Sequence, residues 1–216
     1  MTTTTGSLLR PRLRGVIHLW ATPVAVVLFV VLVARATAAD RVAVSVYAVC
    51  VTAMLAVSAT YHSGRLSPVW FVRLKRLDHS TILLAIAGSY TAVIGLALEG
   101  KTRSTFLVLV WAAATVGILL RMFWLHAPYP VVAVVYVVVG WMAVLDLPAF
   151  VHALSGIELA LFALGGVLYT VGAAVYAVHK PNPWPATFGY HEIFHGLVVL
   201  AALAHYVAVY SLAGRA

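Results

Sequence analysis

The chain has few charged residues and almost no cysteine. Charged side chains make up 9% of its 216 residues, and only six residues are acidic. Hydrophobic residues make up 63%, a composition far from that of a soluble globular domain. The single cysteine, Cys50, excludes a disulfide framework and a thiolate metal site, and we expect it to be a small core or lipid-facing residue in an apolar segment.

Apolar runs of about 20 residues recur along the whole length, and an α-helix of this length crosses the hydrocarbon core of a bilayer. Seven runs predict an all-α polytopic membrane protein with a bundle of seven transmembrane helices. The predicted spans are Val16–Ala34, Val42–His62, Leu77–Leu98, Ser104–Trp124, Val131–Leu147, Ile157–Val178 and Tyr190–Leu212. We expect residues 1–15 to form a cytoplasmic tail, 16–212 the transmembrane domain and 213–216 a C-terminal tail.

The basic residues predict the orientation of these spans. Nine of the 14 Lys and Arg residues fall on the side of the N-terminus and five on the other side. Cytoplasmic loops carry an excess of Lys and Arg, so we expect a cytoplasmic N-terminus and an external C-terminus. The Ala- and Val-rich spans and the preference for Arg over Lys suit a high-GC genome, so we expect the cytoplasmic membrane of a bacterium. The net charge of +8 does not indicate nucleic acid, because the basic residues lie in short loops between apolar runs. The expected partner is membrane lipid, and the oligomeric state stays open.

Two histidines, His191 and His195, stand four residues apart at the start of the last predicted span. Residues i and i+4 share one face of a helix, so both imidazoles can reach one metal ion. With Glu192 the string also matches H-E-x-x-H, in which the glutamate acts on a metal-bound water. No well-spaced third ligand follows, which weakens the protease interpretation. Glu192 is then expected to face the headgroup region or a basic neighbour such as Lys180.

A third histidine is expected at the same depth in the membrane. An odd-numbered span begins, and an even-numbered span ends, on the same side, so His62 and Asp78 should lie level with the H-x-x-x-H pair. Three imidazoles with one open position are typical of catalytic zinc, and we predict that His62, His191 and His195 bind Zn²⁺. Asp78 would orient a ligand or accept a proton from the metal-bound water. Ser58 precedes His62 by one turn and would hydrogen-bond within the site.

Simpler explanations fit the remaining histidines. Four are expected to be interfacial residues near span ends: His18, His126, His152 and His179. His79 points about 100° away from Asp78 on an ideal helix, so we expect it to serve packing or the headgroup boundary. His205 lies about 15 Å beyond His195 along the helix, too far to share its metal, and should make an interhelical hydrogen bond.

Several segments also carry a family pattern. Residues 58–62 read S-A-T-Y-H, residues 76–80 read R-L-D-H-S, residues 88–91 read G-S-Y-T, and residues 165–172 read G-G-V-L-Y-T-V-G. Together with the H-E-I-F-H string, these segments make the chain resemble the hemolysin III family of bacterial membrane proteins. That family is related to the progestin and adipoQ receptors and, more distantly, to the alkaline ceramidases. The chain departs from the pattern at Ala92, where a proline is common.

The resemblance implies a seven-helix bundle with an intramembrane zinc bound by the same three histidines, with Asp78 at the metal-bound water and Ser58 supporting the site. Its relatives imply hydrolysis of an amide bond in a lipid such as ceramide. One alternative is a lipid-sensing receptor or regulatory protein with structural zinc. Another is a pore-forming haemolysin, although no segment of the sequence looks like a secreted amphipathic toxin helix. The substrate, and whether turnover occurs, stay open.

Overall fold

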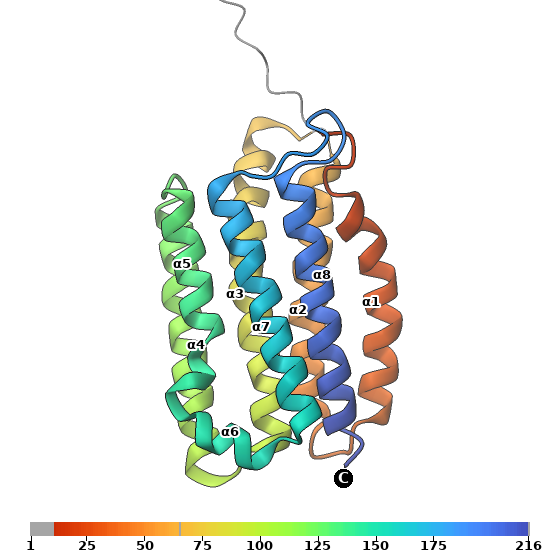
Figure 1. Cartoon of the computed structure of the whole chain (residues 1–216), viewed down its shortest axis with the longest axis vertical. Coiled ribbons are helices and arrows are strands. Elements are labelled where there is room, and N and C mark those ends of the chain that lie inside the picture. The colour runs from red at the N-terminus through yellow and green to blue at the C-terminus, as the bar shows by residue number, and fades with distance from the viewer. Residues whose placement is uncertain (1–10, 65, 216) are drawn as a thin grey trace, which may run out of the picture.

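The computed structural model describes residues 11–64 and 66–215, and most of them are helical (Figure 1). The helices are α1 (Val16–Arg35), α2 (Arg41–Ser63), α3 (Pro68–Ala97), α4 (Gly100–Phe123), α5 (Tyr129–Gly140), α6 (Leu147–Ala153), α7 (Gly156–Val178) and α8 (Tyr190–Leu212), with a 3-10 helix, η1, over Met142–Asp146. Seven helical stretches are long and apolar enough to span a membrane, and these described residues contain no strand. The prediction of an all-α, multi-pass protein is confirmed.

The helices pack as a bundle in which α3 is the central element. α3 contacts α2, α4, α5 and α8, while α1 packs on α2 and α8, and α7 packs on α5 and α8. Figure 1 shows α4 and α5 on one side of the bundle and α1 on the other. The last helix therefore returns to the first three, and the start of α8 comes to lie near the end of α2.

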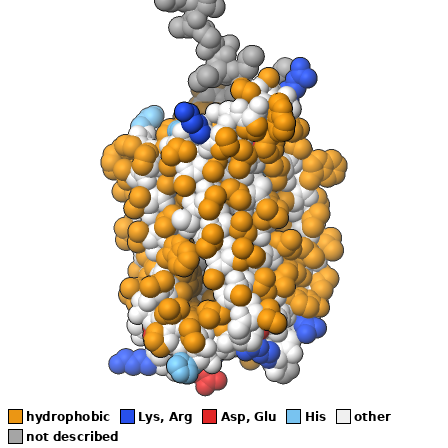
Figure 2. Space-filling view, in the orientation of Figure 1, with side chains coloured by type: hydrophobic (Ala, Val, Ile, Leu, Met, Phe, Trp, Pro, Cys, Tyr) orange, Lys and Arg blue, Asp and Glu red, His pale blue; other side chains and the backbone are white. Residues whose placement is uncertain are grey.

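The outside of the bundle is apolar, and its inside is mostly apolar but also contains buried polar and charged side chains. On α1, Val24, Val27 and Val30 are exposed, and hydrophobic side chains cover the body of the molecule between charged groups at its two ends (Figure 2). The buried polar side chains include four histidines, one aspartate, two glutamates and one arginine near the proposed site or the helix ends: His18, His62, Asp78, Arg121, Glu158, His191, Glu192 and His195. Ionisable groups inside a membrane protein are costly and usually mark a functional site, so these buried side chains are candidates for one.

The third helix begins nine residues earlier than predicted, at Pro68 instead of Leu77. Proline fits the first turn of a helix because its missing N–H would have no partner there, so the Ser67-Pro68 pair starts the helix and does not form a connection. Asp78 therefore lies within α3 and not at its start. Its side chain is buried in the bundle, with only 8% of its surface exposed.

The fifth predicted span is not a continuous helix, which corrects the prediction for Val131–Leu147. It breaks after Gly140 into η1 and α6. The hydroxyl of Tyr90, from α3, donates to the Gly140 carbonyl at 2.8 Å and accepts from the Ala143 N–H at 2.9 Å. A broken helix is tolerated at membrane depth when side chains satisfy the freed backbone groups, and Tyr90 does so here.

Small residues allow α2 and α3 to approach closely. A Cβ added at Gly88 would lie 2.7 Å from the Cβ of Cys50, and one added at Gly95 would lie 2.7 Å from the Cβ of Ala43. Close backbone approach through small residues is a common way for membrane helices to associate without a hydrophobic driving force. Of the two roles expected for Cys50, a small core residue or a lipid-facing one, the contact with Gly88 supports the first. This contact fixes α2, which carries His62, against α3, which carries Asp78.

Candidate metal centre and its cavity

Three buried histidine side chains converge at one end of the bundle. His62 comes from the last turn of α2, and His191 and His195 come from the first two turns of α8. The Nε2 atoms of His62 and His191 are 3.1 Å apart, and one ring nitrogen from each of the three histidines lies within 4.8 Å of the others. The span order and the i,i+4 spacing therefore identified side chains that the fold does bring together, and this group is capable of holding a metal ion.

Two backbone features hold these histidines in place. The chain enters α1 through Gly15, with φ at 83°, and a Cβ at this position would lie 2.6 Å from the Cβ of His62. A residue with a side chain would therefore be strained there and would collide with His62. At the other helix, α8 begins directly after Gly189, whose N–H donates to Glu192 Oε2 at 2.8 Å.

Asp78 and Ser58 lie beside the histidine cluster. Asp78 Oδ2 is 3.8 Å from His62 Nε2, and the Ser58 side chain hydrogen-bonds the Asp78 carboxyl. All three side chains are buried, and Ser58 and His62 stand one turn apart on α2. The predicted grouping of Asp78 and Ser58 with the histidines thus matches their positions, while their chemical roles stay predictions.

His18 is not the interfacial residue that the sequence suggested. Its ring is 3% exposed and stacks on the ring of His195, with centroids 3.9 Å apart and planes 8° from parallel. The difference arises because α1 packs against α8, which turns the start of the first span inward. His18 therefore supports one side of the cluster, whereas His126 and His152 are exposed as expected and His179 is half-buried near Tyr129.

Glu192 pairs with a basic neighbour, as one of the two expectations had it, but this neighbour is Arg14 and not Lys180. It is 1% exposed, and its Oε1 accepts a hydrogen bond from Arg14 Nε at 2.6 Å; the predicted neighbour, Lys180, is exposed. Arg14 lies in the predicted tail 1–15, of which residues 1–10 fall outside the described part of the chain. Residues 12 and 13 donate backbone hydrogen bonds to Ala186 and Thr187, so the chain before α1 lies across the loop before α8.

We expect Glu192→Gln to lower the free energy of unfolding by about 2 kcal/mol, because it leaves the Arg14 guanidinium partly buried without its carboxylate. Arg14→Met should cause a similar loss, and the double variant should lose much less than the sum, as contacting partners do. Thermal unfolding in detergent measures this cycle. Lys180→Met is the matched control with no expected change; a loss there equal to that of Arg14→Met would contradict the pairing.

Arg121 is a buried residue whose importance the sequence did not reveal. It falls near the end of the predicted span Ser104–Trp124, and it lies in the last turn of α4 with 1% exposure. Its guanidinium hydrogen-bonds His79 Nδ1 and donates to the carbonyls of Trp124 and Leu125. His79 is therefore a buried partner of Arg121, so of the two roles expected for it packing holds and the headgroup boundary does not. It adjoins Asp78 on the side of α3 that faces α4.

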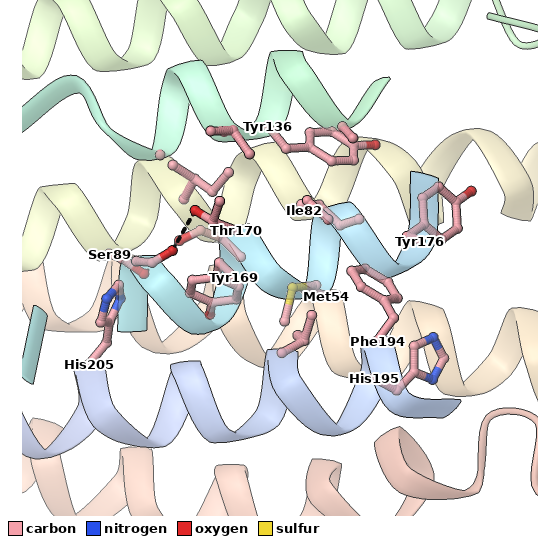
Figure 3. Close-up of a pocket in the computed structure, with 18 of the residues that line it drawn as sticks. Met54, Ile82, Ser89, Tyr136, Tyr169, Thr170, Tyr176, Phe194, His195 and His205 are labelled. Carbon is pink, nitrogen blue, oxygen red and sulfur yellow. Dashed lines mark hydrogen bonds between the residues drawn. The ribbon is translucent and has the colours of Figure 1, made fainter. Parts of the chain in front are cut away.

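A long cavity extends from the histidine cluster into the bundle. Its volume is about 430 Å³, within the range of ligand pockets, and most of its surface is apolar. His18, His62 and Asp78 line one end, and Phe150, Leu154 and Leu159 are also among its lining residues. Figure 3 shows His195 at one end of the view, His205 at the other, and Met54, Ile82 and Tyr169 between them.

His205 makes the interhelical hydrogen bond that the sequence predicted. Its Nε2 lies 3.3 Å from the carbonyl oxygen of Phe162 in α7. A Cβ at Gly165 would collide with the imidazole, so the absence of a side chain there makes room for the ring. His205 is thus separate from the cluster of His62, His191 and His195, which lies at the other end of the cavity.

Comparison with known proteins finds one matching family model and several similar membrane proteins. The family model described as Haemolysin-III related matches residues 7–206. The Hemolysin-3 homolog of Bacillus subtilis is 34% identical over 136 residues, which cover 63% of this chain and 61% of that protein's length. Hemolysin-3 of Bacillus cereus is 29% identical over 166 residues, covering 77% and 75%. Heptahelical transmembrane protein 5 of Arabidopsis thaliana is 43% identical over 68 residues, covering 29% and 17%.

Proposed function

The chain belongs to the Haemolysin-III related family of membrane proteins, and from this membership and the buried histidine cluster we propose that it is a zinc-dependent hydrolase of lipid amides. The observation that carries the proposal is the position of the cluster. Three imidazoles and a carboxylate lie at one end of a long apolar cavity inside a membrane protein. A polar reactive centre joined to an apolar cavity suits a substrate with a polar linkage and a hydrocarbon chain.

The histidine cluster fits a zinc ion. Zinc bound to histidine nitrogens at about 2.0–2.1 Å in a tetrahedron holds those nitrogens roughly 3.3 Å apart. The 3.1 Å between the Nε2 atoms of His62 and His191 is close to this value. Three protein ligands leave one tetrahedral position open, as in catalytic sites. Zinc bound there would polarise a carbonyl and lower the pKa of a bound water to about 7.

Asp78 is the proposed proton carrier. Amide hydrolysis adds water across a C–N bond and yields a carboxylic acid and an amine, so a proton must pass from the water to the amine nitrogen. Asp78 lies 3.8 Å from His62 Nε2 and is buried, so it can accept that proton near the reacting atoms and return it to the leaving amine. The Ser58 hydroxyl, hydrogen-bonded to the same carboxyl, holds Asp78 in position.

The apolar part of the cavity would bind the acyl chain. Met54, Ile82 and Phe194 line it between the cluster and His205, and burying a hydrocarbon chain among such residues is favourable by about 0.8 kcal/mol per CH₂ group. A ceramide-like lipid, with one amide linkage and a long acyl chain, has the chemistry that this cavity requires. We also propose that the protein lies in the bacterial cytoplasmic membrane with its N-terminus inside, as the excess of basic residues on that side favours.

The direct test joins metal analysis to a hydrolysis assay. Purified protein in detergent should contain about one zinc per chain by mass spectrometry of the metal, and it should release fatty acid from a short-chain ceramide. The same protein after chelation is the matched control, and adding zinc back should restore the release. Protein that carries no zinc, or that hydrolyses ceramide equally well after chelation, would rule the proposal out.

A second candidate function comes from the names of two relatives. The Bacillus proteins are called Hemolysin-3 or its homolog, and a pore-forming protein of this kind would permeabilise membranes. Purified protein in liposomes should then conduct ions, and conductance should not depend on the histidine cluster. A hydrolase should instead leave the liposomes sealed.

A further inference from the structure

The far end of the cavity carries a second group of polar side chains, well away from the proposed zinc site. His205 of α8, Ser89 of α3 and Thr170 of α7 line the cavity, and Figure 3 shows them gathered at the end opposite His195. All three lie inside membrane-spanning helices, about two turns or more from either end, and the cavity that they line is mostly apolar. Polar groups at such a depth are costly, so their convergence from three helices calls for a reason beyond packing.

The hydrogen-bonding pattern shows that this group presents acceptors. A carbonyl oxygen only accepts, so the contact of His205 Nε2 with the Phe162 carbonyl places the hydrogen on Nε2. Nδ1 then has a lone pair, and this buried atom has no hydrogen-bond partner among the described residues.

The hydroxyls of Ser89 and Thr170 also present acceptors to the cavity. Ser89 donates its hydrogen to the carbonyl of Ala85 at 2.8 Å, and Thr170 donates to the carbonyl of Gly166 at 2.7 Å. Each hydroxyl thus donates its one hydrogen within its own helix. The Thr170 oxygen also accepts from Trp141 Nε1 at 2.9 Å and has one lone pair left, whereas the Ser89 oxygen can accept two hydrogen bonds. A plain hydrocarbon chain, an ether or a carbonyl offers no donor to such a site, whereas an O–H group does.

We propose that this polar group is a subsite for a hydroxyl on the acyl chain, so that the protein prefers lipids whose acyl chain is hydroxylated near its twelfth carbon. The position follows from geometry. His205 lies ten residues beyond His195 on α8, about 15 Å along the helix axis. A C–C bond of about 1.52 Å at tetrahedral angles advances an extended chain by roughly 1.25 Å per carbon, so about twelve carbons reach from the cluster to His205.

This proposal rests on the proposed function, in which an acyl chain lies in the cavity, but its test needs no hydrolysis. Detergent-purified protein is incubated with equal amounts of stearate, 12-hydroxystearate and 6-hydroxystearate. The protein is then washed, and the retained acids are quantified by mass spectrometry against protein-free micelles. One additional buried hydrogen bond changes affinity by roughly tenfold, so we expect about tenfold enrichment of the 12-hydroxy acid and no enrichment of the 6-hydroxy isomer.

His205→Phe is the matched variant, because it keeps a ring of similar shape in the space beside Gly165 and removes the acceptor. It should bind stearate like the wild type and lose the preference for the 12-hydroxy acid. Ser89→Ala gives a second measurement, with a smaller loss of preference, should the His205 variant fail to fold. Retention of stearate with no hydroxyl preference in the wild type would overturn the subsite and leave the proposed function standing. Failure of all three acids to bind would overturn the subsite, because no acyl chain then lies in the cavity, and the zinc and hydrolysis measurements decide the proposed function separately.

Discussion

Changing His195 to alanine is expected to remove zinc from the purified protein and to abolish lipid-amide hydrolysis. His195 is 2% exposed and belongs to the cluster with His62 and His191, so its loss leaves two ligands and a buried space. Losing even a supporting partner of a metal ligand weakens binding by roughly 10–100-fold, and losing a ligand should cost more. We expect hydrolysis to fall by at least about a thousandfold, measured together with zinc content at matched protein concentration.

Two further variants make this result specific. His152→Ala changes an exposed histidine of α6 and should leave the zinc content unchanged. His18→Phe keeps a ring stacked on His195 while removing the imidazole nitrogens, and it too should retain the metal. If His18→Phe lost zinc as completely as His195→Ala, the ligand set would have to include His18. If His195→Ala kept the zinc content of the wild type, the histidine cluster would be excluded as the metal site.

The number and order of the spans follow from the sequence because apolar length is a local property. The grouping of His62 with His191 and His195 also follows, because span order fixes the side of the membrane on which each helix end lies. The break in the fifth span could not be predicted in the same way. It depends on the Tyr90 hydroxyl, which lies 50 residues from Gly140 in sequence and satisfies the backbone there.

The partners of the buried basic residues could not be predicted from the sequence either, for a related physical reason. A basic residue near a span end looks the same whether it faces headgroups or turns inward to a partner. Arg14 turns to Glu192 and Arg121 to His79, because the neighbouring helices supply those partners. The sequence therefore identified the cluster but not the residues that support it, among them His18, which α1 brings against His195 by packing on α8.

Asp78→Asn is expected to separate catalysis from metal binding. Asparagine has nearly the same shape as aspartate and can keep a hydrogen bond to Ser58, so the histidine cluster and its zinc should be retained. It cannot carry a proton between water and the leaving amine, and loss of general acid–base catalysis lowers kcat by roughly a hundred- to ten-thousandfold. KM should change little if Asp78 acts mainly in the transition state.

The companion variant is Ser58→Ala, which removes only the group that holds the Asp78 carboxyl and should lower kcat by about tenfold or less. A receptor or regulatory protein with structural zinc gives a different pattern: Asp78→Asn would alter thermal stability and leave no turnover to lose. The decisive comparison is kcat at equal zinc occupancy in the wild type and both variants. Full turnover in Asp78→Asn with zinc bound would show that the proton moves through another group and that Asp78 only supports the fold.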